Sequence, residues 1–535
     1  MSKKITLAIL VALAAILGVA LWQKNDGVET GKILTKKNAA VSAAQETETV
    51  ELKNGDRYDL TMSPVEKTID GKKYAMVAYN GSIPGPVLRV PQGAEITVNV
   101  KNDSNMATTL HAHGVRMTNA FDGVPGLTQK EVAPGESFAY TLSFPDAGAF
   151  WYHPHVRTDY ALESGLYGSI IVTPKETGYW APANRELSLM LDDIAVDKNG
   201  IVPFDEKTAD HTLMGRFGNV MLVNGETDYA LSAMKGEVVR LYLTNAANTR
   251  LFNFVLPGAK MKLVGADSGR YIMETWADEV LLAPGERRVV DVLFDRTGTY
   301  EMKHQTPGKA YALGTVTVSD GVVTPDHSKA FATLRTNASE REAVGKLTND
   351  YLNQAPAKTL RLALDMNQEM QGMMQGNSGH MGGGHMMGNG MMMSGSSMED
   401  HEEKYEWEDT MAAMNARSNA SMMKWQVIDA KTKQANTDIK DWKFALGDKV
   451  KIRILNDPNS MHPMQHPIHF HGQNFLVLAT NGVKNENPVW TDTALIASGD
   501  TVDILLDASN KGMWMAHCHI LEHAESGMML MYEVE

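Results

Sequence analysis

His517-Cys518-His519 is the most informative stretch of this sequence, and Cys518 is the only cysteine among the 535 residues of the chain. In a β-strand, neighbouring side chains point to opposite faces and every second side chain shares a face. A strand here places the thiol on one face and the two imidazoles together on the other. Cysteine and histidine are ligands that copper prefers. Because His523 and Met528 follow soon after the thiol, its face has the ligands of a blue-copper electron-transfer site, and the imidazole face can bridge two more copper ions.

Histidines gather in four places along the chain. Of the 17 histidines, ten lie in four short clusters. The clusters are His111-Ala112-His113, His153-Pro154-His155, His466-Pro467-Ile468-His469-Phe470-His471, and the group of His517, His519 and His523. The alternative is a buried structural cysteine flanked by surface histidines, because a free cysteine usually packs as a small hydrophobic side chain. One cluster would fit that alternative, but four clusters, one of them around the only thiol, indicate metal binding.

Length and charge limit the class of protein. A chain of 535 residues is too long for one hydrophobic core, and its length predicts about three domains. The formal net charge of −14 argues against binding to nucleic acid or to anionic membrane surfaces. With one cysteine the chain forms no internal disulfide, so metal ligation would protect the thiol in an oxidising compartment.

The N-terminal segment predicts export. Residues 5–22 are apolar and follow Lys3 and Lys4, which is typical of a signal peptide or of a single membrane anchor. With its linker, this segment occupies residues 1–44. A signal peptide predicts a periplasmic or cell-surface protein, and an anchor predicts one tethered to the inner membrane by its N-terminus.

A tight turn followed by an alternating strand occurs three times. The turns are Ala133-Pro-Gly-Glu136, Ala283-Pro-Gly-Glu286 and Ala497-Ser-Gly-Asp500, and each follows a glycine turn and a strand that ends in asparagine, at 92–102, 235–245 and 446–456. This repetition predicts three homologous all-β sandwich domains. The predicted domains are 45–176, 177–322 and 358–535, with a linker at 323–357. Because the histidine clusters fall in the first and third domains, the second is predicted to be a spacer.

The third repeat carries an insertion. The first two turns are 150 residues apart, and the second and third are 214 apart. Residues 366–398 hold 11 of the 34 methionines, together with His380, His385 and many glycines. The segment has no helical or strand period, which predicts a low-complexity loop without a role in the core. Since thioethers are soft ligands that favour Cu(I), the loop is also predicted to gather Cu(I).

Together these motifs resemble the three-domain multicopper oxidase family, which includes laccases, ascorbate oxidase and bacterial copper-tolerance oxidases. The resemblance covers residues 75–535. The motifs that carry it are Asn80-Gly-Ser-Ile-Pro-Gly-Pro86, His111-Ala-His-Gly114, Trp151-Tyr-His-Pro-His155, His466-Pro-Ile-His-Phe-His-Gly472, and His517-Cys-His-Ile-Leu-Glu-His523 with Gly527-Met528. The resemblance implies an all-β fold of three consecutive cupredoxin-like Greek-key β-sandwich domains.

The resemblance also implies four copper ions. The implied ligands are His466, Cys518, His523 and axial Met528 for the type 1 copper, His111 and His469 for the type 2 copper, His113, His153 and His519 for one type 3 copper, and His155, His471 and His517 for the other. The last three ions would form one site between the first and third domains. Cys518 would relay electrons to that site through His517 and His519.

The implied reaction couples one-electron oxidations of a substrate to the four-electron reduction of O2 to water. Asp122, eleven residues after His111, matches an acidic residue that lies near the three-copper site in family members and would deliver protons. The alternative is a turn aspartate, because Asp-Gly is a common turn pair. The chain is expected to act as a monomer, with O2 and a small reducing substrate as partners and without nucleic acid.

Three interpretations of the function remain open. The first is a cuprous oxidase that converts Cu(I) to Cu(II) in copper tolerance, with Met464, two residues before a type 1 ligand, at the Cu(I) site. Met411 and Met414 are further candidates, with helical packing at i and i+3 as an equal alternative. The second is a laccase that oxidises small phenolic substrates over His466 or His523. The third is a copper carrier or sink without turnover, which the complete set of ligands disfavours.

Overall fold

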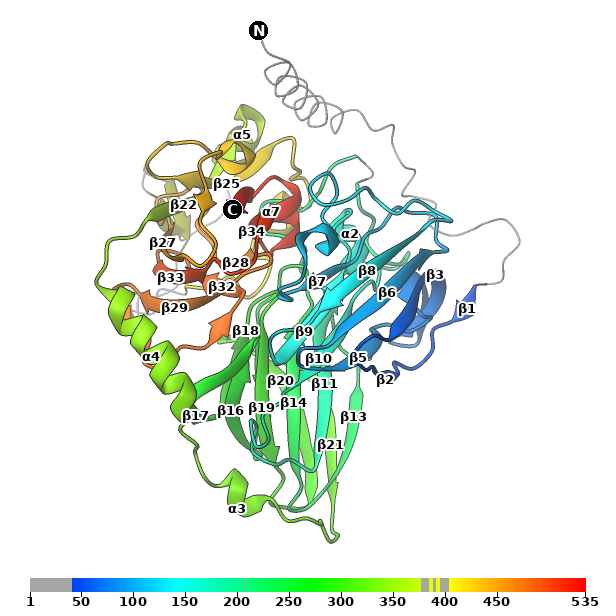
Figure 1. Cartoon of the computed structure of the whole chain (residues 1–535). Coiled ribbons are helices and arrows are strands. Elements are labelled where there is room, and N and C mark those ends of the chain that lie inside the picture. Colours follow the sequence, from blue (N-terminus) through cyan, green and yellow to red (C-terminus); the bar gives the residue numbers. More distant parts are fainter. Residues whose placement is uncertain (1–40, 206, 377–383, 388–390, 395–403) are drawn as a thin grey trace.

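The computed structural model describes residues 41–205, 207–376, 384–387, 391–394 and 404–535. The described residues form six large β-sheets, which pair into three sandwiches along the chain (Figure 1). The fold is therefore all-β, with three consecutive cupredoxin-like Greek-key β-sandwiches. The predicted signal peptide or anchor at residues 5–22 lies outside the described residues. In the part of the chain that is described, no helix is long and apolar enough to cross a membrane.

The first sandwich pairs a sheet of order β1-β3-β6-β8, with β4 beside β3, against a sheet of order β2-β5-β10-β9-β7. Its strands are β1 (Ser42–Ala43), β2 (Thr49–Glu51), β3 (Arg57–Ile69), β4 (Lys72–Tyr79), β5 (Gly85–Pro91), β6 (Glu95–Asn102), β7 (His111–His113), β8 (Ser137–Ser143), β9 (Gly148–His153) and β10 (Gly168–Thr173). In β6, Ile96, Val98 and Val100 are buried in the core, because alternate side chains of a strand share a face.

The second sandwich pairs a sheet of order β12-β11-β14-β19-β16-β17 against a sheet of order β13-β21-β20-β15-β18. Its strands are β11 (Arg185–Ile194), β12 (Val220–Val223), β13 (Tyr229–Met234), β14 (Val238–Asn245), β15 (Phe252–Val255), β16 (Lys260–Ala266), β17 (Gly269–Ala277), β18 (Glu279–Leu282), β19 (Arg287–Leu293), β20 (Gly298–Gln305) and β21 (Ala310–Ser319). Every residue of β14 is buried, since Tyr242 on its outer face packs with Ala149 and Ile171 of the first sandwich.

The third sandwich pairs a sheet of order β25-β22-β27-β33-β29-β30, with β31 beside β29, against a sheet of order β26-β35-β34-β28-β32. Its strands are β22 (Lys358–Met366), β25 (Met423–Asp429), β26 (Lys443–Phe444), β27 (Lys449–Asn456), β28 (His466–Phe470), β29 (Asn474–Thr480), β30 (Val483–Lys484), β31 (Trp490–Thr491), β32 (Thr493–Ile496), β33 (Thr501–Asp507), β34 (Gly512–Cys518) and β35 (Met529–Val534). Its core includes the fully buried Trp425, Trp442 and Trp514.

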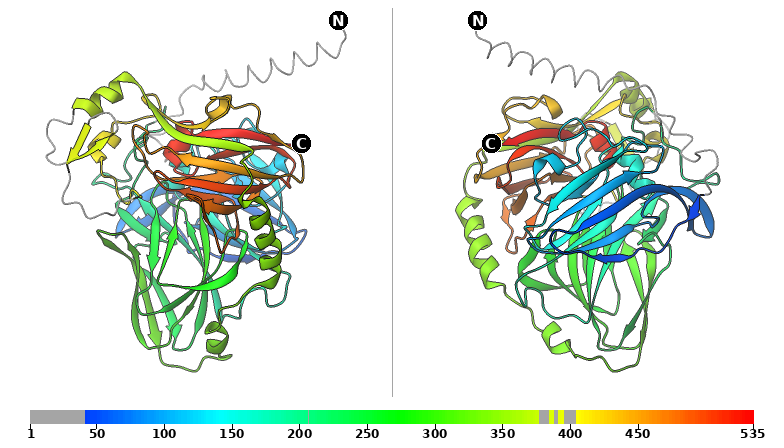
Figure 2. Two further views of the ribbon diagram at one scale, coloured as in Figure 1. Left: turned by 90° about the vertical axis from the view of Figure 1, so that its left-hand side faces the viewer. Right: turned by 45° about the vertical axis from the view of Figure 1, so that its right-hand side comes forward.

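Short helices connect and cover the sandwiches. They are α2 (Thr158–Glu163), α3 (Ser328–Phe331), α4 (Ala338–Leu352), α5 (Gln368–Gly376), α6 (Ala412–Asn415) and α7 (Leu521–Glu525), with the 3-10 turns η2 (Asn119–Phe121) and η4 (Asn436–Asp438). The predicted linker at 323–357 contains α3 and α4. Helix α4 runs along the outside of the second and third sandwiches (Figure 2), where Val344 packs with Ile272 and Leu476.

The three sequence repeats fold in the same way. In each, the strand that ends in asparagine pairs antiparallel with the strand after the turn, as β6 with β8, β14 with β19, and β27 with β33. The side-chain amides of Asn102, Asn245 and Asn456 each donate to two backbone carbonyls, one of them on the residue just before the turn. The asparagine therefore holds the turn against the preceding strand in every repeat.

The prediction that residues 366–398 have no role in the core is wrong for the start of that segment. β22 ends at Met366, and α5 begins two residues later. Met366 and Met370 are buried in the core of the third sandwich. A hairpin of β23 (Gly384–Met387) and β24 (Met391–Ser394) follows, and His380 lies outside the described residues. Met373, three residues after Met370 on α5, also packs against this core, so the start of the segment has the one-sided apolar spacing of a helix.

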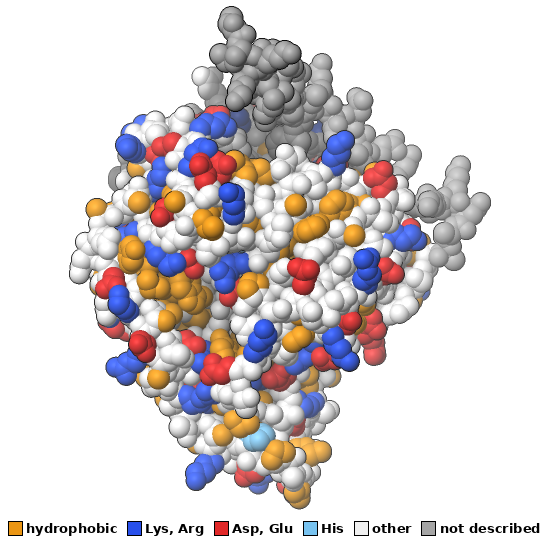
Figure 3. Space-filling view, in the orientation of Figure 1, with side chains coloured by type: hydrophobic (Ala, Val, Ile, Leu, Met, Phe, Trp, Pro, Cys, Tyr) orange, Lys and Arg blue, Asp and Glu red, His pale blue; other side chains and the backbone are white. Residues whose placement is uncertain are grey.

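Charged side chains of both signs are scattered over the face of the molecule in Figure 3. Exposed ion pairs on the protein surface include Lys101 with Asp103 and Lys73 with Glu66. Exposed pairs of this kind contribute little to stability. The predicted functional residues lie beneath this surface, beginning with the buried Cys518.

Candidate copper centres

The type 1 ligands predicted from the sequence meet inside the third sandwich. Cys518 ends β34, His466 begins β28 beside it, and His523 lies in α7. Their ligand atoms all lie within 4.8 Å of one another. Cys518 Sγ is 3.6 Å from His466 Nδ1, and His523 Nδ1 is 3.4 Å from the same atom. Two imidazoles and a thiol that converge in a buried space have the composition of a blue-copper site.

Met528 lies beside this type 1 group. Its backbone carbonyl accepts a hydrogen bond from the Cys518 N–H (3.1 Å), and its own N–H donates to the His523 carbonyl (3.0 Å). The side chain is fully buried in the same core as Cys518. Burial raises the pKa of the Cys518 thiol. A thiol in this position ionises when a cation binds to it, which fits copper ligation.

An indole covers the imidazoles of the type 1 group. Trp425 of β25 stacks on His523 with ring centroids 4.2 Å apart and meets His466 edge-on at 4.7 Å. Its Nε1–H donates to the carbonyl of Thr212, in the loop between β11 and β12 (2.7 Å), and the residue is 1 % exposed. Trp425 was not among the predicted site residues, because a tryptophan on an alternating strand reads as ordinary core.

The other predicted ligands form one cluster between the first and third sandwiches, here called the eight-histidine cluster. Its members are His111, His113, His153, His155, His469, His471, His517 and His519. β7 and β9 pair so that His111 lies opposite His153, and β28 and β34 pair so that His469 lies opposite His517. Each strand pair therefore places two histidines side by side on its own sandwich. The two pairs meet, since the rings of His111 and His469 are 5.9 Å apart.

Sets of three ligand atoms within this cluster lie within 4.8 Å of one another. The sets are His111, His113 and His469; His111, His155 and His471; His113, His153 and His519; and His469, His471 and His517. The third set is the predicted ligand set of one type 3 copper. The set predicted for the other, His155, His471 and His517, is divided between two groups, although its rings lie 5.0, 5.1 and 5.2 Å apart. All eight histidines come together, and the assignment of ligands to individual ions stays a prediction.

Hydrogen bonds fix the tautomers of these imidazoles. The Nδ1–H groups of four of them donate to backbone carbonyls at 2.8–2.9 Å, His111 to Asp122, His153 to Pro154, His469 to Asp492 and His517 to Cys518. The Nε2 atom of each ring then carries a lone pair. Burial lowers the pKa of His517 to about 3, so this imidazole is neutral and able to ligate at neutral pH.

The lone pairs point to one another rather than to donors. Nε2 of His111, His153, His155 and His469 is buried and has no hydrogen-bond partner among the described residues. Nε2 of His471 lies 3.1 Å from Nε2 of His517. Two lone pairs at this distance repel unless a cation lies between or beside them, and buried polar atoms are otherwise paired. The donor set therefore fits bound copper.

Asp122 contacts two imidazoles of the eight-histidine cluster. Its Oδ2 accepts a hydrogen bond from Nδ1 of His471 (2.9 Å), and its Oδ1 lies 3.2 Å from Nδ1 of His111. Burial raises the pKa of this carboxyl, but the two imidazoles outweigh it and hold the pKa well below its usual range. Asp122 thus orients two candidate ligands, and its delivery of protons stays a prediction.

Asp492 contacts two imidazoles of the eight-histidine cluster, and the sequence patterns missed it. Its Oδ1 accepts from Nε2 of His113 and its backbone carbonyl from Nδ1 of His469, both at 2.9 Å. Thr493 Oγ1 lies 3.1 and 3.2 Å from the same two rings. Burial raises the pKa of Asp492, but the Arg287 guanidinium outweighs it and holds the pKa well below its usual range. Asp492 belongs to no histidine motif, so nothing in the sequence set it apart.

The candidate Cu(I) ligands lie in or against the core of the third sandwich, which also contains Cys518. Met464 is buried in the same core as Cys518. Met411 precedes α6 and Met414 lies in it, and both half-buried side chains pack against that core. His462 is buried nearby, and its Nε2 has no hydrogen-bond partner among the described residues. These positions suit packing and soft-metal binding alike, so the ligand role stays a prediction.

Three models of the multicopper oxidase family match the chain, at residues 61–177, 189–321 and 405–535. One model falls on each sandwich, and together they cover most of the chain. The chain therefore belongs to the multicopper oxidase family and is an oxidoreductase. Membership implies copper as the cofactor, which agrees with the buried ligand groups.

Known relatives span nearly the same length. Copper resistance protein A of Escherichia coli is 25% identical over 90% of this chain and 93% of the relative. Multicopper oxidase MmcO of Mycobacterium tuberculosis is 25% identical over 88% of this chain and 85% of the relative. Among solved structures, a multi-copper oxidase from Pseudomonas thermotolerans has a TM-score of 0.66 at 25% identity, covering 91% of this chain and 100% of that one.

Proposed function

We propose that this chain oxidises Cu(I) to Cu(II) in copper tolerance and passes the electrons to O2. Four Cu(I) ions, one O2 and four protons give four Cu(II) ions and two water molecules. One observation carries this proposal. At the end of β34, Cys518 joins the type 1 group, while its neighbours His517 and His519 join the eight-histidine cluster. The two sites are thus linked through a few covalent bonds.

Four resident copper ions would supply the one-electron redox steps when bound. The residues that would hold them are His466, Cys518, His523 and Met528 for type 1, His111 and His469 for type 2, and His113, His153, His519, His155, His471 and His517 for type 3. The protein orients these side chains. Asp122 Oδ2 holds the proton of His471 Nδ1, and Asp492 Oδ1 holds the proton of His113 Nε2, so the opposite ring nitrogens face the interior.

The position of Trp425 favours a small metal ion over a bulky phenol as the substrate of the type 1 group. The indole stacks on one face of His523 and contacts His466 edge-on, which leaves less room for an aromatic substrate beside these two imidazoles. Thioethers of Met464, Met411 and Met414 lie in or against the same core and are soft ligands suited to Cu(I). The similarity to a protein named copper resistance protein A favours the same role.

Export is part of this proposal. The apolar residues 5–22 follow two lysines, as in a signal peptide, and we place the protein in the periplasm as a monomer. The Met-rich residues from 377 onward would collect Cu(I) there.

Oxygen uptake by the copper-loaded protein tests the proposal. Cu(I) and a simple phenol serve as reductants, each with and without added Cu(II). Strong uptake with Cu(I), and phenol uptake that needs added Cu(II), would support the cuprous oxidase. Strong uptake with phenol alone and weak uptake with Cu(I) would make the protein a laccase. Copper binding without uptake from either reductant would leave a copper carrier or sink.

A further inference from the structure

The repeated turn of the second sandwich, Ala283-Pro-Gly-Glu286, reaches the eight-histidine cluster. A Cβ atom added to Gly285 would lie 2.9 Å from Cγ of His519 and 3.3 Å from Cε1 of His113. The equivalent Gly135 has open space at this position, and Gly499 meets only Pro458 at 3.7 Å. All three glycines have positive φ, which explains a glycine in each turn. Contact with imidazoles is particular to the second sandwich.

Arg287, two residues after Gly285, ties the three sandwiches together. It is fully buried. Its Nη1 and Nη2 donate to the two carboxylate oxygens of Asp492 in the third sandwich, at 2.8 and 2.5 Å. Its Nε donates to the carbonyl of Ala149 in β9 of the first sandwich (2.8 Å). A planar guanidinium suits such a bidentate contact, and a lysine would not reproduce it.

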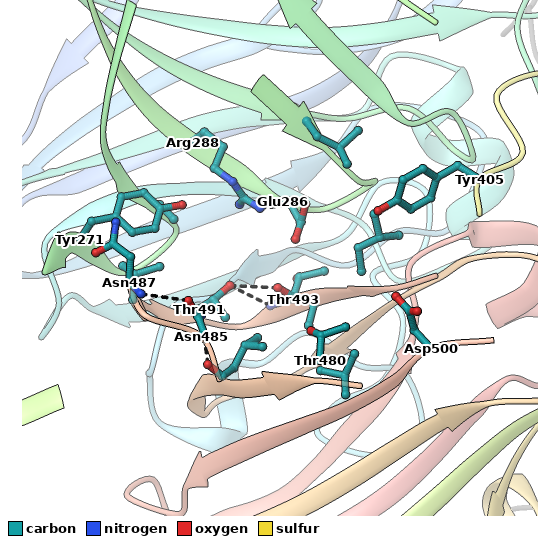
Figure 4. Close-up of a pocket in the computed structure, with 17 residues that line it drawn as sticks. Tyr271, Glu286, Arg288, Tyr405, Thr480, Asn485, Asn487, Thr491, Thr493 and Asp500 are labelled. Atoms are coloured by element: carbon teal, nitrogen blue, oxygen red, sulfur yellow. Dashed lines mark hydrogen bonds and ion pairs between the residues drawn. The ribbon is translucent and has the colours of Figure 1, made fainter. Parts of the chain in front are cut away.

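The neighbours of Arg287 show that its direction is set by strand alternation. Glu286 and Arg288 face a cavity of about 490 Å³ between the second and third sandwiches. Figure 4 shows both of them across this cavity from Thr491 and Thr493. Because successive side chains alternate, Arg287 points away from the cavity, toward Asp492 and the imidazoles behind it.

Asp492 transmits this contact to two candidate ligands. Its carboxylate accepts from Nε2 of His113, and its carbonyl accepts from Nδ1 of His469. Arg287 holds the carboxylate, and the carboxylate fixes the tautomer and tilt of His113. The backbone at Gly285 lies so close to His113 and His519 that a Cβ atom there would crowd both rings. Partners behind a metal ligand orient it and tune its affinity.

We propose that the second sandwich is a working part of the three-copper site: the turn 283–287 positions His113, His469 and His519 through Gly285 and the Arg287–Asp492 pair. Arg287 and Asp492 are positioning residues, and the second domain is more than the spacer that its lack of histidine clusters predicts. This inference rests on the proposed copper ligands of the eight-histidine cluster.

The test compares Arg287→Met with Arg240→Met. Arg240 is a matched control, because it is equally buried in the second sandwich and makes a bidentate pair with Asp291 at 2.8 and 2.9 Å without touching an imidazole of the cluster. Each holoenzyme is titrated with a copper chelator. Copper per chain, the EPR signal of nitrogen-bound copper and the visible band of thiolate-bound copper are followed separately.

We expect Arg287→Met to release the nitrogen-bound copper at about 10-fold to 100-fold lower chelator concentration. The thiolate band and the Arg240→Met protein should match the wild type. Equal retention of nitrogen-bound copper in Arg287→Met and wild type would overturn the inference. If Arg287→Met does not fold, Gly285→Ala and Arg287→Lys take its place with the same readouts and the same criterion. A wild-type protein without nitrogen-bound copper would instead refute the proposed ligands.

Discussion

Replacing Trp425 by leucine should open the type 1 group to phenols. The substitution removes the indole that stacks on His523 and the hydrogen bond from Nε1–H to the Thr212 carbonyl. A buried acceptor left without its donor costs about 1–3 kcal/mol. Complete truncation of a buried tryptophan costs about 3–5 kcal/mol, and leucine fills part of the space. We therefore expect the free energy of unfolding of the third domain to fall by about 3 kcal/mol.

Trp442→Leu is the matched control for this substitution. Trp442 is also 1 % exposed in the same core, and its Nε1–H donates to Asp429 Oδ2 (2.9 Å). Its ring contacts Phe444 rather than a type 1 imidazole. Urea denaturation monitored by fluorescence should give a similar loss of stability for the two variants.

Steady-state kinetics separates the two variants. In Trp425→Leu, kcat/KM for a simple phenol should rise about 10-fold, which corresponds to about 1.4 kcal/mol of transition-state stabilisation. Cu(I) oxidation should stay within about 2-fold of the wild type. Trp442→Leu should leave both activities unchanged. If phenol oxidation is unchanged in Trp425→Leu while its blue band is intact, or rises equally in both variants, the indole does not restrict access.

Two further substitutions and two deletions test other parts of the proposal. Cys518→Ser should abolish the blue band and oxygen uptake but leave the circular dichroism unchanged, and residual turnover would refute the electron route through the thiolate. Met464→Leu conserves volume and should cost less than about 1.5 kcal/mol of stability, yet raise KM for Cu(I) and not for phenol; an unchanged KM would assign Met464 to packing alone. Deletion of residues 377–398 should lower Cu(I) oxidation more than phenol oxidation, and equal losses would rule out a dedicated copper role. Deletion from residue 366 should in addition unfold the third domain at lower urea, because each buried methionine removed from its core, as at Met366 and Met370, costs about 2–5 kcal/mol.

Much of the fold followed from repetition in the sequence. The asparagine-ended strands and the turns after them predicted three sandwiches, and Asn102, Asn245 and Asn456 make the same two hydrogen bonds in each. Local patterns of this kind are readable because strand alternation and turn chemistry depend on adjacent residues. The burial of Met370 was not readable, because its partners come from distant strands of the third sandwich.

The sequence by itself determined which side chains carry the chemistry. Alternation along a strand is a property of the backbone, so a thiol and the histidines on either side of it lie on opposite faces of the strand. Cys518 accordingly joins the type 1 group, and His517 joins the eight-histidine cluster. Only the tertiary structure decided which side chains cover the type 1 imidazoles and which orient the ligands of the eight-histidine cluster. Trp425 covers the type 1 imidazoles, and Asp492 and Arg287 support His113 from other sandwiches. Such contacts join residues that are hundreds of positions apart, and their energy arises from burial and hydrogen bonding that exist only after the three sandwiches have packed together.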